Sequence, residues 1–190
     1  MARLRFTSLL TRRLAWLAPR TAERFARDRD GAAAVEFALV ATPFFMILFG
    51  ILEIALIFFA TAVIEDAVSQ SARDIRTGEV QTAGQTEEDF RASICQRINT
   101  VADCGRLRLD VRTFDNFAST DLSTPLGEDG DLNDENFVFQ PGEAGDVVVV
   151  RVFYDWQLLG PGIINGLADM PGNRRLITSA TAFRNEPFGA

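Results

Sequence analysis

The fold of this chain is decided by one stretch near its N-terminus, residues 31–78, which reads GAAAVEFALVATPFFMILFGILEIALIFFATAVIEDAVSQSARDIRTG. Its apolar part runs from Phe37 to Ile64, 28 residues that contain a single charge, Glu53. A helix needs about 20 residues to cross the hydrocarbon core of a bilayer. We therefore predict a transmembrane helix over residues 32–62. Pro43 lies inside it, and membrane helices accommodate such a proline more readily than soluble helices do.

Charge is distributed unevenly on the two sides of this helix. The chain of 190 residues has a net charge of -7, which divides into +5 for residues 1–30, -2 for residues 31–64 and -10 for residues 65–190. Basic residues favour the cytoplasmic side of a membrane helix. We therefore expect a single-pass protein of the inner (plasma) membrane, with a basic cytoplasmic leader at 1–31 and a periplasmic domain at 63–190. The acidic domain argues against a nucleic-acid partner, because phosphate binding needs a basic face.

Three interpretations of the apolar stretch compete. A secretory signal could be cleaved after the Ala-Thr-Ala of residues 60–62, although its apolar region should be about 7–15 residues long. A permanent membrane anchor accounts for the length but not for a carboxylate, Glu36, at the start of the apolar run. A prepilin-type signal, cut on the cytoplasmic side before the apolar run, uses both features.

The segment GAAAVEF, residues 31–37, carries a specific resemblance. Together with the apolar span, its early proline and the helix that follows to Gly78, it resembles the TadE-like pseudopilins of the tight-adherence (Flp) pilus system. Residues 178–186, TSATAFRNE, are similar to the end of that family's domain. The resemblance implies that a prepilin peptidase cuts after Gly31, within a recognition site formed by Gly31, Ala32, Glu36 and Phe37.

The resemblance also implies a role and a set of partners. The role is that of a minor pseudopilin that supports pilus biogenesis, adherence and biofilm formation. The partners are the prepilin peptidase, other pseudopilins, the Flp pilin, the inner-membrane platform proteins of the Tad system and the lipid bilayer. The main alternative is a permanently anchored single-pass envelope protein with an exported sensor or scaffold domain.

Glu36, Glu53 and Pro43 are the residues expected to act in assembly and helix pairing. A cut after Gly31 gives Ala32 a charged amine, which needs a partner in lipid, and Glu36 lies about one helical turn away. Glu53 allows two interpretations. It is either an interfacial glutamate near the outer membrane boundary or a partner for another helix within an assembly.

The rest of the chain predicts a pilin-like α+β domain. An apolar stripe at Ile64, Val68, Ser71/Ala72 and Ile75 continues the first helix as an amphipathic helix, which Gly78 ends. A second, short helix begins at a capping box formed by Thr86 and Asp89. A small antiparallel sheet should follow, from three or four strands at residues 107–113, 137–139, 147–156 and 174–184, with residues 119–136 as a solvated loop.

Cysteine and histidine usage limits the chemistry. Cys95 and Cys104 are the two cysteines of the chain, and an exported domain favours a disulfide between them. Histidine is absent, which removes Ser-His and Cys-His nucleophile pairs. Residues 129–133 superficially resemble a calcium loop, but Asp134 and Gln140 occupy the positions where an EF-hand needs Gly and Glu. We therefore expect no enzyme, metal or cofactor.

Overall fold

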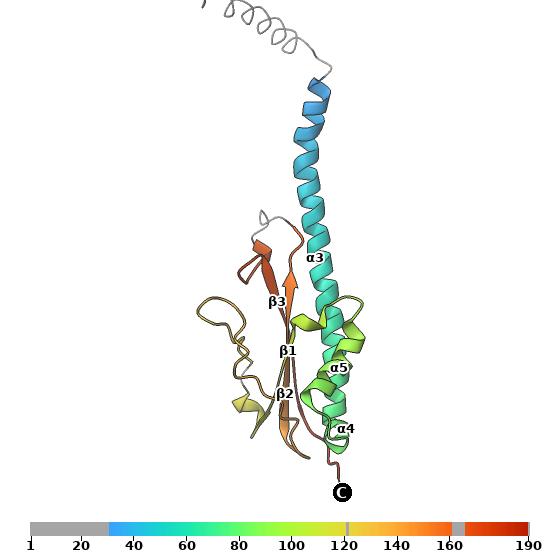
Figure 1. Cartoon of the computed structure of the whole chain (residues 1–190), viewed down its shortest axis with the longest axis vertical. Coiled ribbons are helices and arrows are strands. Elements are labelled where there is room, and N and C mark those ends of the chain that lie inside the picture. The colour runs from blue at the N-terminus through green and yellow to red at the C-terminus, as the bar shows by residue number, and fades with distance from the viewer. Residues whose placement is uncertain (1–30, 121, 161–165, 190) are drawn as a thin grey trace, which may run out of the picture. The chain divides into compact units, whose positions relative to one another are not determined.

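The computed structural model describes residues 31–120, 122–160 and 166–189. The predicted leader therefore lies outside the described residues, except for Gly31. The described residues divide into two units, one that ends at Leu48 and one that begins at Phe49. In chain order the elements are α3 (Ala32–Arg76), α4 (Glu79–Thr82), α5 (Glu87–Ile98), the 3-10 helix η1 (Cys104–Arg106), β1 (Leu107–Phe114), the 3-10 helix η2 (Phe117–Ser119), β2 (Val147–Gln157) and β3 (Arg174–Arg184) (Figure 1).

Helix α3 changes its environment along its length. It has 45 residues, and it is the one helix among the described residues that is long and apolar enough to cross a membrane. Its large apolar side chains are exposed from Val35 to Phe59, apart from Ile57. Farther along, the predicted stripe of Ile64, Val68, Ser71/Ala72 and Ile75 is buried, which confirms the sequence analysis.

Two local signals end α3 and begin α5 as predicted. Gly78 follows α3 with a φ of 82°, a left-handed conformation that glycine adopts readily. The capping box forms at Thr86, whose hydroxyl accepts the N–H of Asp89 at 3.3 Å while the Asp89 carboxylate accepts the N–H of Thr86 at 3.0 Å. The backbone and side-chain hydrogen bonds from Thr86 lower the pKa of Asp89 below its ordinary value of 3.8.

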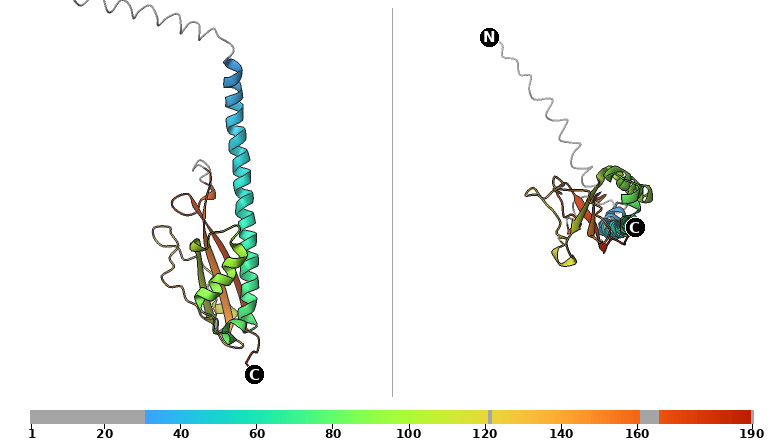
Figure 2. Two further views of the ribbon diagram at one scale, coloured as in Figure 1. Left: turned by 45° about the vertical axis from the view of Figure 1, so that its right-hand side comes forward. Right: turned by 90° about the horizontal axis from the view of Figure 1, so that it is seen from below.

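The strands form an antiparallel sheet in the order β1-β2-β3. Val150 sits at its centre and pairs with Val111 of β1 and Thr181 of β3. One face of the sheet packs against α3 and α5 in a single core that contains Val148, Val150, Val152 and Tyr154 of β2, Ile64 and Ile75 of α3, and Phe90, Ile94 and Ile98 of α5. The two helices lie on the same side of the sheet in both views of Figure 2.

The fourth strand considered at residues 137–139 does not form. Phe139 makes only an isolated parallel bridge to Val111, with hydrogen bonds from the N–H of Val111 to the carbonyl of Val138 and from the N–H of Gln140 to the carbonyl of Val111. The pairing stops there because Pro141 follows, and proline has no N–H to donate to a ladder.

The second face of the sheet, which points away from α3 and α5, is also covered by protein. Val147, Val149, Arg151 and Phe153 of β2 point away from the helices and are nevertheless buried. The connection between β1 and β2, residues 115–146, runs over this face, where Phe137 stacks on Phe153 with ring centroids 5.3 Å apart (Figure 2). The loop predicted at 119–136 is thus largely exposed itself but shields the strands beneath it.

Candidate functional site

Gly31 occupies an exposed turn directly before α3. Its carbonyl accepts the N–H of Val35 at 3.1 Å, so the helix begins at Ala32. A Cβ atom added to Gly31 would meet no atom of the described residues within 4 Å, and the backbone there is not in the left-handed region. The fold therefore places no demand for glycine at this position. A requirement for glycine must come from something that acts on the chain from outside.

Glu36 and Phe37 lie in the second turn of α3 and are exposed to solvent in this structure. Ala32 and Glu36 are four positions apart, so they share one face of the helix at a rise of about 6 Å. Glu36 forms no ion pair within residues 31–120, 122–160 and 166–189. The geometry would let this carboxylate meet a cation at the helix N-terminus, either of its own chain or of a neighbour.

Pro43 lies inside α3, which continues on both sides of it. Proline lacks the N–H that would bond the carbonyl four residues earlier, so it leaves the carbonyl of Leu39 without its helical donor. The hydroxyl of Thr42 donates to the carbonyl of Ala38 at 2.7 Å in the same turn. The early proline is accommodated within a continuous helix, as the sequence analysis expected for a membrane segment.

Glu53 is held by the chain itself. It is only 5% exposed, and its carboxylate oxygens accept the backbone N–H groups of Leu159 at 2.9 Å and Gly160 at 2.7 Å. Sequence analysis anticipated neither hydrogen bond, because a backbone donor has no side-chain signature that a pattern could reveal. The structure thus adds an intramolecular role for Glu53, while pairing with a neighbouring helix stays a prediction.

The predicted disulfide is present. Cys95 of α5 and Cys104 at the start of η1 are bonded, with Cα atoms 5.7 Å apart. The bridge joins the last turns of α5 to the segment that leads into β1. It therefore connects α5 to the sheet close to the C-terminal end of this helix, where Ile98 is fully buried in the core.

A buried ion cluster on the second face of the sheet was not predicted. Asp110 of β1 is fully buried, and it lies opposite Arg151 of β2 in the register. Its carboxylate accepts from Nη2 of Arg151 at 2.6 Å, from Nε of Arg112 at 3.0 Å and from the N–H of Val138 at 3.0 Å. In a strand with one buried face, Asp110 would lie on the solvent-facing side, because its neighbours Leu109 and Val111 face the core. The cluster shows that this side carries the loop between β1 and β2.

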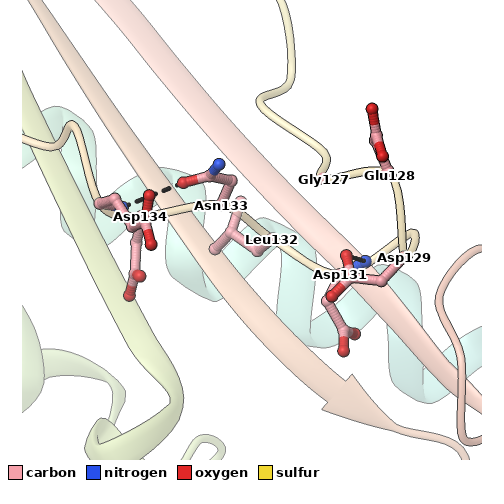
Figure 3. A pocket seen from close by; sticks show the side chains of 8 residues that line it. Gly127, Glu128, Asp129, Asp131, Leu132, Asn133 and Asp134 are labelled. Atoms are coloured by element: carbon pink, nitrogen blue, oxygen red, sulfur yellow. Dashed lines mark hydrogen bonds between the residues drawn. The ribbon is translucent and has the colours of Figure 1, made fainter.

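The acidic loop at residues 127–135 surrounds a hollow of about 440 Å³ (Figure 3). Its acidic side chains do not converge on one point, as Figure 3 shows. Asp131 pairs with Arg174 of β3, and Asp134 pairs with Arg108 of β1 at 2.8 Å. Within the part of the chain that the structure describes, no group of three or more His, Cys, Asp or Glu side chains could hold a metal ion. These carboxylates fasten the loop to the sheet.

Comparison with known proteins bears on the N-terminal segment. Residues 31–73 match the family model described as TadE-like protein. Neither a search of curated proteins nor a search of solved structures found a match. The family match begins at Gly31 and covers the apolar span and most of the buried part of α3, which confirms the resemblance for this segment. The resemblance of residues 178–186 to the end of the family's domain stays a prediction.

Proposed function

We propose, on the premise that residues 31–73 are a TadE-like segment, that this chain is a minor pseudopilin of the Tad (Flp) pilus system. In this role it is processed by a prepilin peptidase and supports pilus biogenesis, adherence and biofilm formation. Its partners are other pseudopilins, the Flp pilin and the inner-membrane platform proteins. It is a single-pass protein of the inner membrane, and its folded domain lies in the periplasm.

The observation that carries this proposal is the position of Gly31. The family match starts at this glycine, yet the fold would accept a side chain there. A peptidase that needs glycine before its cut explains both facts. Cleavage would place a charged amine on Ala32, and an ammonium group in lipid needs a partner. Glu36 shares its helix face and supplies that partner, within the chain or on the adjacent subunit.

The membrane assignment follows from the composition of α3. Its apolar side chains between Val35 and Phe59 are exposed, and such a run in a helix of this length favours a bilayer over water. The basic residues precede this run and the acidic domain follows it, which favours a cytoplasmic N-terminus.

We also place the chain among structural components rather than enzymes. The sequence has no histidine, and its two cysteines are bonded to each other. The buried carboxylates Asp110 and Glu53 are engaged by arginine side chains and by backbone N–H groups, respectively. In the proposed role the protein is a substrate of the prepilin peptidase and not itself a catalyst.

The test is the mass of the mature N-terminus from native membranes. The proposal expects a chain that begins at Ala32. An intact chain from Met1 would contradict processing and favour the permanently anchored envelope protein, whereas a chain that begins at Val63 would favour a secreted domain.

The variant Gly31→Trp sharpens this test. It should leave an uncut precursor of slower mobility, because a bulky side chain does not fit a site that needs glycine. The matched control is Gly166→Trp, since a Cβ at Gly166 also meets no atom of residues 31–120, 122–160 and 166–189 within 4 Å. If Gly31→Trp is still cut before Ala32, the proposed cleavage site is wrong.

A further inference from the structure

A small apolar groove lies between α3 and the start of β3, which we call the interfacial groove. Its volume is about 350 Å³. Its walls include Ile54, Phe58 and Thr61 of α3, Leu167 of the loop between β2 and β3, and Arg175 and Ile177 of β3. All six residues belong to the unit formed by residues 49–190.

The depth of the groove follows from the length of the membrane span. A hydrocarbon core of about 30 Å takes about 20 helical residues, which reach from Ala34 to Glu53. Ile54, Phe58 and Thr61 come directly afterwards, in the last turns of the span predicted over residues 32–62, so they fall where the hydrocarbon core meets the lipid headgroups on the side of the folded domain. Phe58 is 71% exposed, so a large apolar side chain of α3 lies at the wall of the groove with little cover from the described part of the protein.

Other features also fit contact with lipid. Leu159 is 75% exposed, and it lies in the short segment that Glu53 holds against α3 through the N–H groups of Leu159 and Gly160. The hydrogen bonds that Glu53 accepts therefore keep a large apolar side chain at the same end of the domain as the interfacial groove. In water this exposure would be unfavourable, whereas at a membrane surface it is favourable.

The charge of the interfacial groove comes from Arg175. Its Nη1 donates to the carbonyl of Leu167 at 3.0 Å, and within the described ranges the guanidinium forms no ion pair. The carboxylate of Glu53 is already bound to backbone N–H groups. A planar guanidinium suits two oxygens of a phosphate group.

We propose that the interfacial groove binds one phospholipid from the leaflet that faces the folded domain. An acyl chain packs against Ile54, Phe58 and Leu167, and the phosphate pairs with Arg175. This proposal rests on the membrane span of the proposed function but not on pilus assembly. Because the groove continues the exposed apolar surface of α3, a lipid can enter it from the bilayer without crossing water.

The test is native mass spectrometry of the full chain, released from detergent micelles that contain phosphatidylglycerol. We expect the wild-type protein to retain one phosphatidylglycerol molecule. Arg175→Gln should weaken retention about tenfold, the loss of one charge-assisted interaction. Arg184→Gln is the matched control, because it removes the same charge from an exposed site at the other end of β3. It should retain lipid as the wild type does.

A second variant and two further probes keep the result interpretable. Leu167→Asp should also lower retention, because its carboxylate can neutralise Arg175 and makes a groove wall polar. Inorganic phosphate should neither bind nor compete, and diacylglycerol, which lacks a phosphate, should be retained about as weakly as phosphatidylglycerol is by Arg175→Gln. Circular dichroism should show that each variant keeps the helix and strand content of the wild type.

Four outcomes would overturn the proposal. The first is that Arg175→Gln retains phosphatidylglycerol as well as the wild type does, and the second is that Arg184→Gln loses the lipid as Arg175→Gln does. The third is that inorganic phosphate competes with the lipid. The fourth is a dimer of the wild type that disappears in Arg175→Gln, which would mean that the groove is a contact between two copies of the chain. The same spectrum gives the mass of the chain and thus its N-terminus. Failure of lipid binding is therefore distinguishable from failure of cleavage before Ala32.

Discussion

Glu53 and Gly160 are joined by a 2.7 Å hydrogen bond between residues 107 positions apart in the chain. The other carboxylate oxygen of Glu53 accepts the N–H of Leu159. Glu53→Ala should cost about 1.5–3 kcal/mol of local stability, since hydrogen bonds to charged groups contribute that much. Hydrogen exchange of the Leu159 and Gly160 amides should accelerate. Glu65→Ala, at an exposed site on the same helix, is the control. Unchanged exchange at Gly160 would contradict this role.

The buried pair of Asp110 and Arg151 should dominate the electrostatic stability of the sheet. Asp110→Ala removes a buried carboxylate that accepts from Nη2 of Arg151, from Nε of Arg112 and from the N–H of Val138. It should cost at least about 3 kcal/mol, because each hydrogen bond to a charged group contributes about 1.5–3 kcal/mol. Arg108→Ala breaks a pair whose side chains are 43% and 46% exposed, and it should cost about 0–1 kcal/mol. Denaturant unfolding of the full chain in micelles measures both. Similar losses for the two variants would show that burial does not set the strength of these pairs.

The capping box predicts a pH dependence in the acid range. Hydrogen bonds from Thr86 lower the pKa of Asp89 below 3.8, so the folded state binds this proton less tightly than the unfolded state does. The contribution of Asp89 is thus present above pH 3.8 and is lost as the pH falls through its lowered pKa. Asp89→Asn should flatten the stability profile below about pH 4. An unchanged profile would mean that the capping carboxylate contributes nothing.

The disulfide should stabilise the domain mainly by restricting the unfolded chain. The bond between Cys95 and Cys104 closes a loop of ten residues. Loop-closure arithmetic gives about 2.5–3 kcal/mol for that size. The variant with both cysteines changed to Ser should unfold at a correspondingly lower denaturant concentration. Wild-type protein treated with a reductant should match it, and a variant as stable as the oxidised wild type would contradict the prediction.

Substitution of Gly78 should destabilise the fold for two separate reasons, backbone strain and a steric clash. Its φ is 82°, and a Cβ atom there would lie 2.2 Å from Cγ of Phe188. Gly145 has a similar φ of 87°, but a Cβ atom there would meet nothing within 4 Å, so this position isolates the backbone contribution. Gly145→Ala should cost about 1–2 kcal/mol. Gly78→Ala should lower the free energy of unfolding by more than this, because the ring of Phe188 must also move. Thermal unfolding of both variants measures the difference. Equal losses would contradict the steric contribution of Phe188.

Much of this fold is encoded in short segments. Each of four features can be recognised from residues only a few positions apart in the chain. These are the apolar run of 28 residues that ends at Ile64, the apolar stripe along α3, the capping box at Thr86 and the alternating pattern of β2. The spacing of Ala32 and Glu36 belongs to the same class, because about one helical turn separates them. Sequence alone therefore determined the two longer helices α3 and α5, the three strands and the segment that matches the TadE-like family, but not the single turn of α4.

The tertiary structure decided which polar groups are buried and what they contact. Asp110 is a charged residue on the face of β1 that lies away from the helices, and it is buried because the loop between β1 and β2 covers this face. Glu53 accepts hydrogen bonds from backbone N–H groups more than 100 positions away in the chain. The segment 137–139 has strand-like composition, but Pro141 limits its pairing with β1. Such contacts depend on where distant parts of the chain meet, and periodicity within a short window carries no information about that.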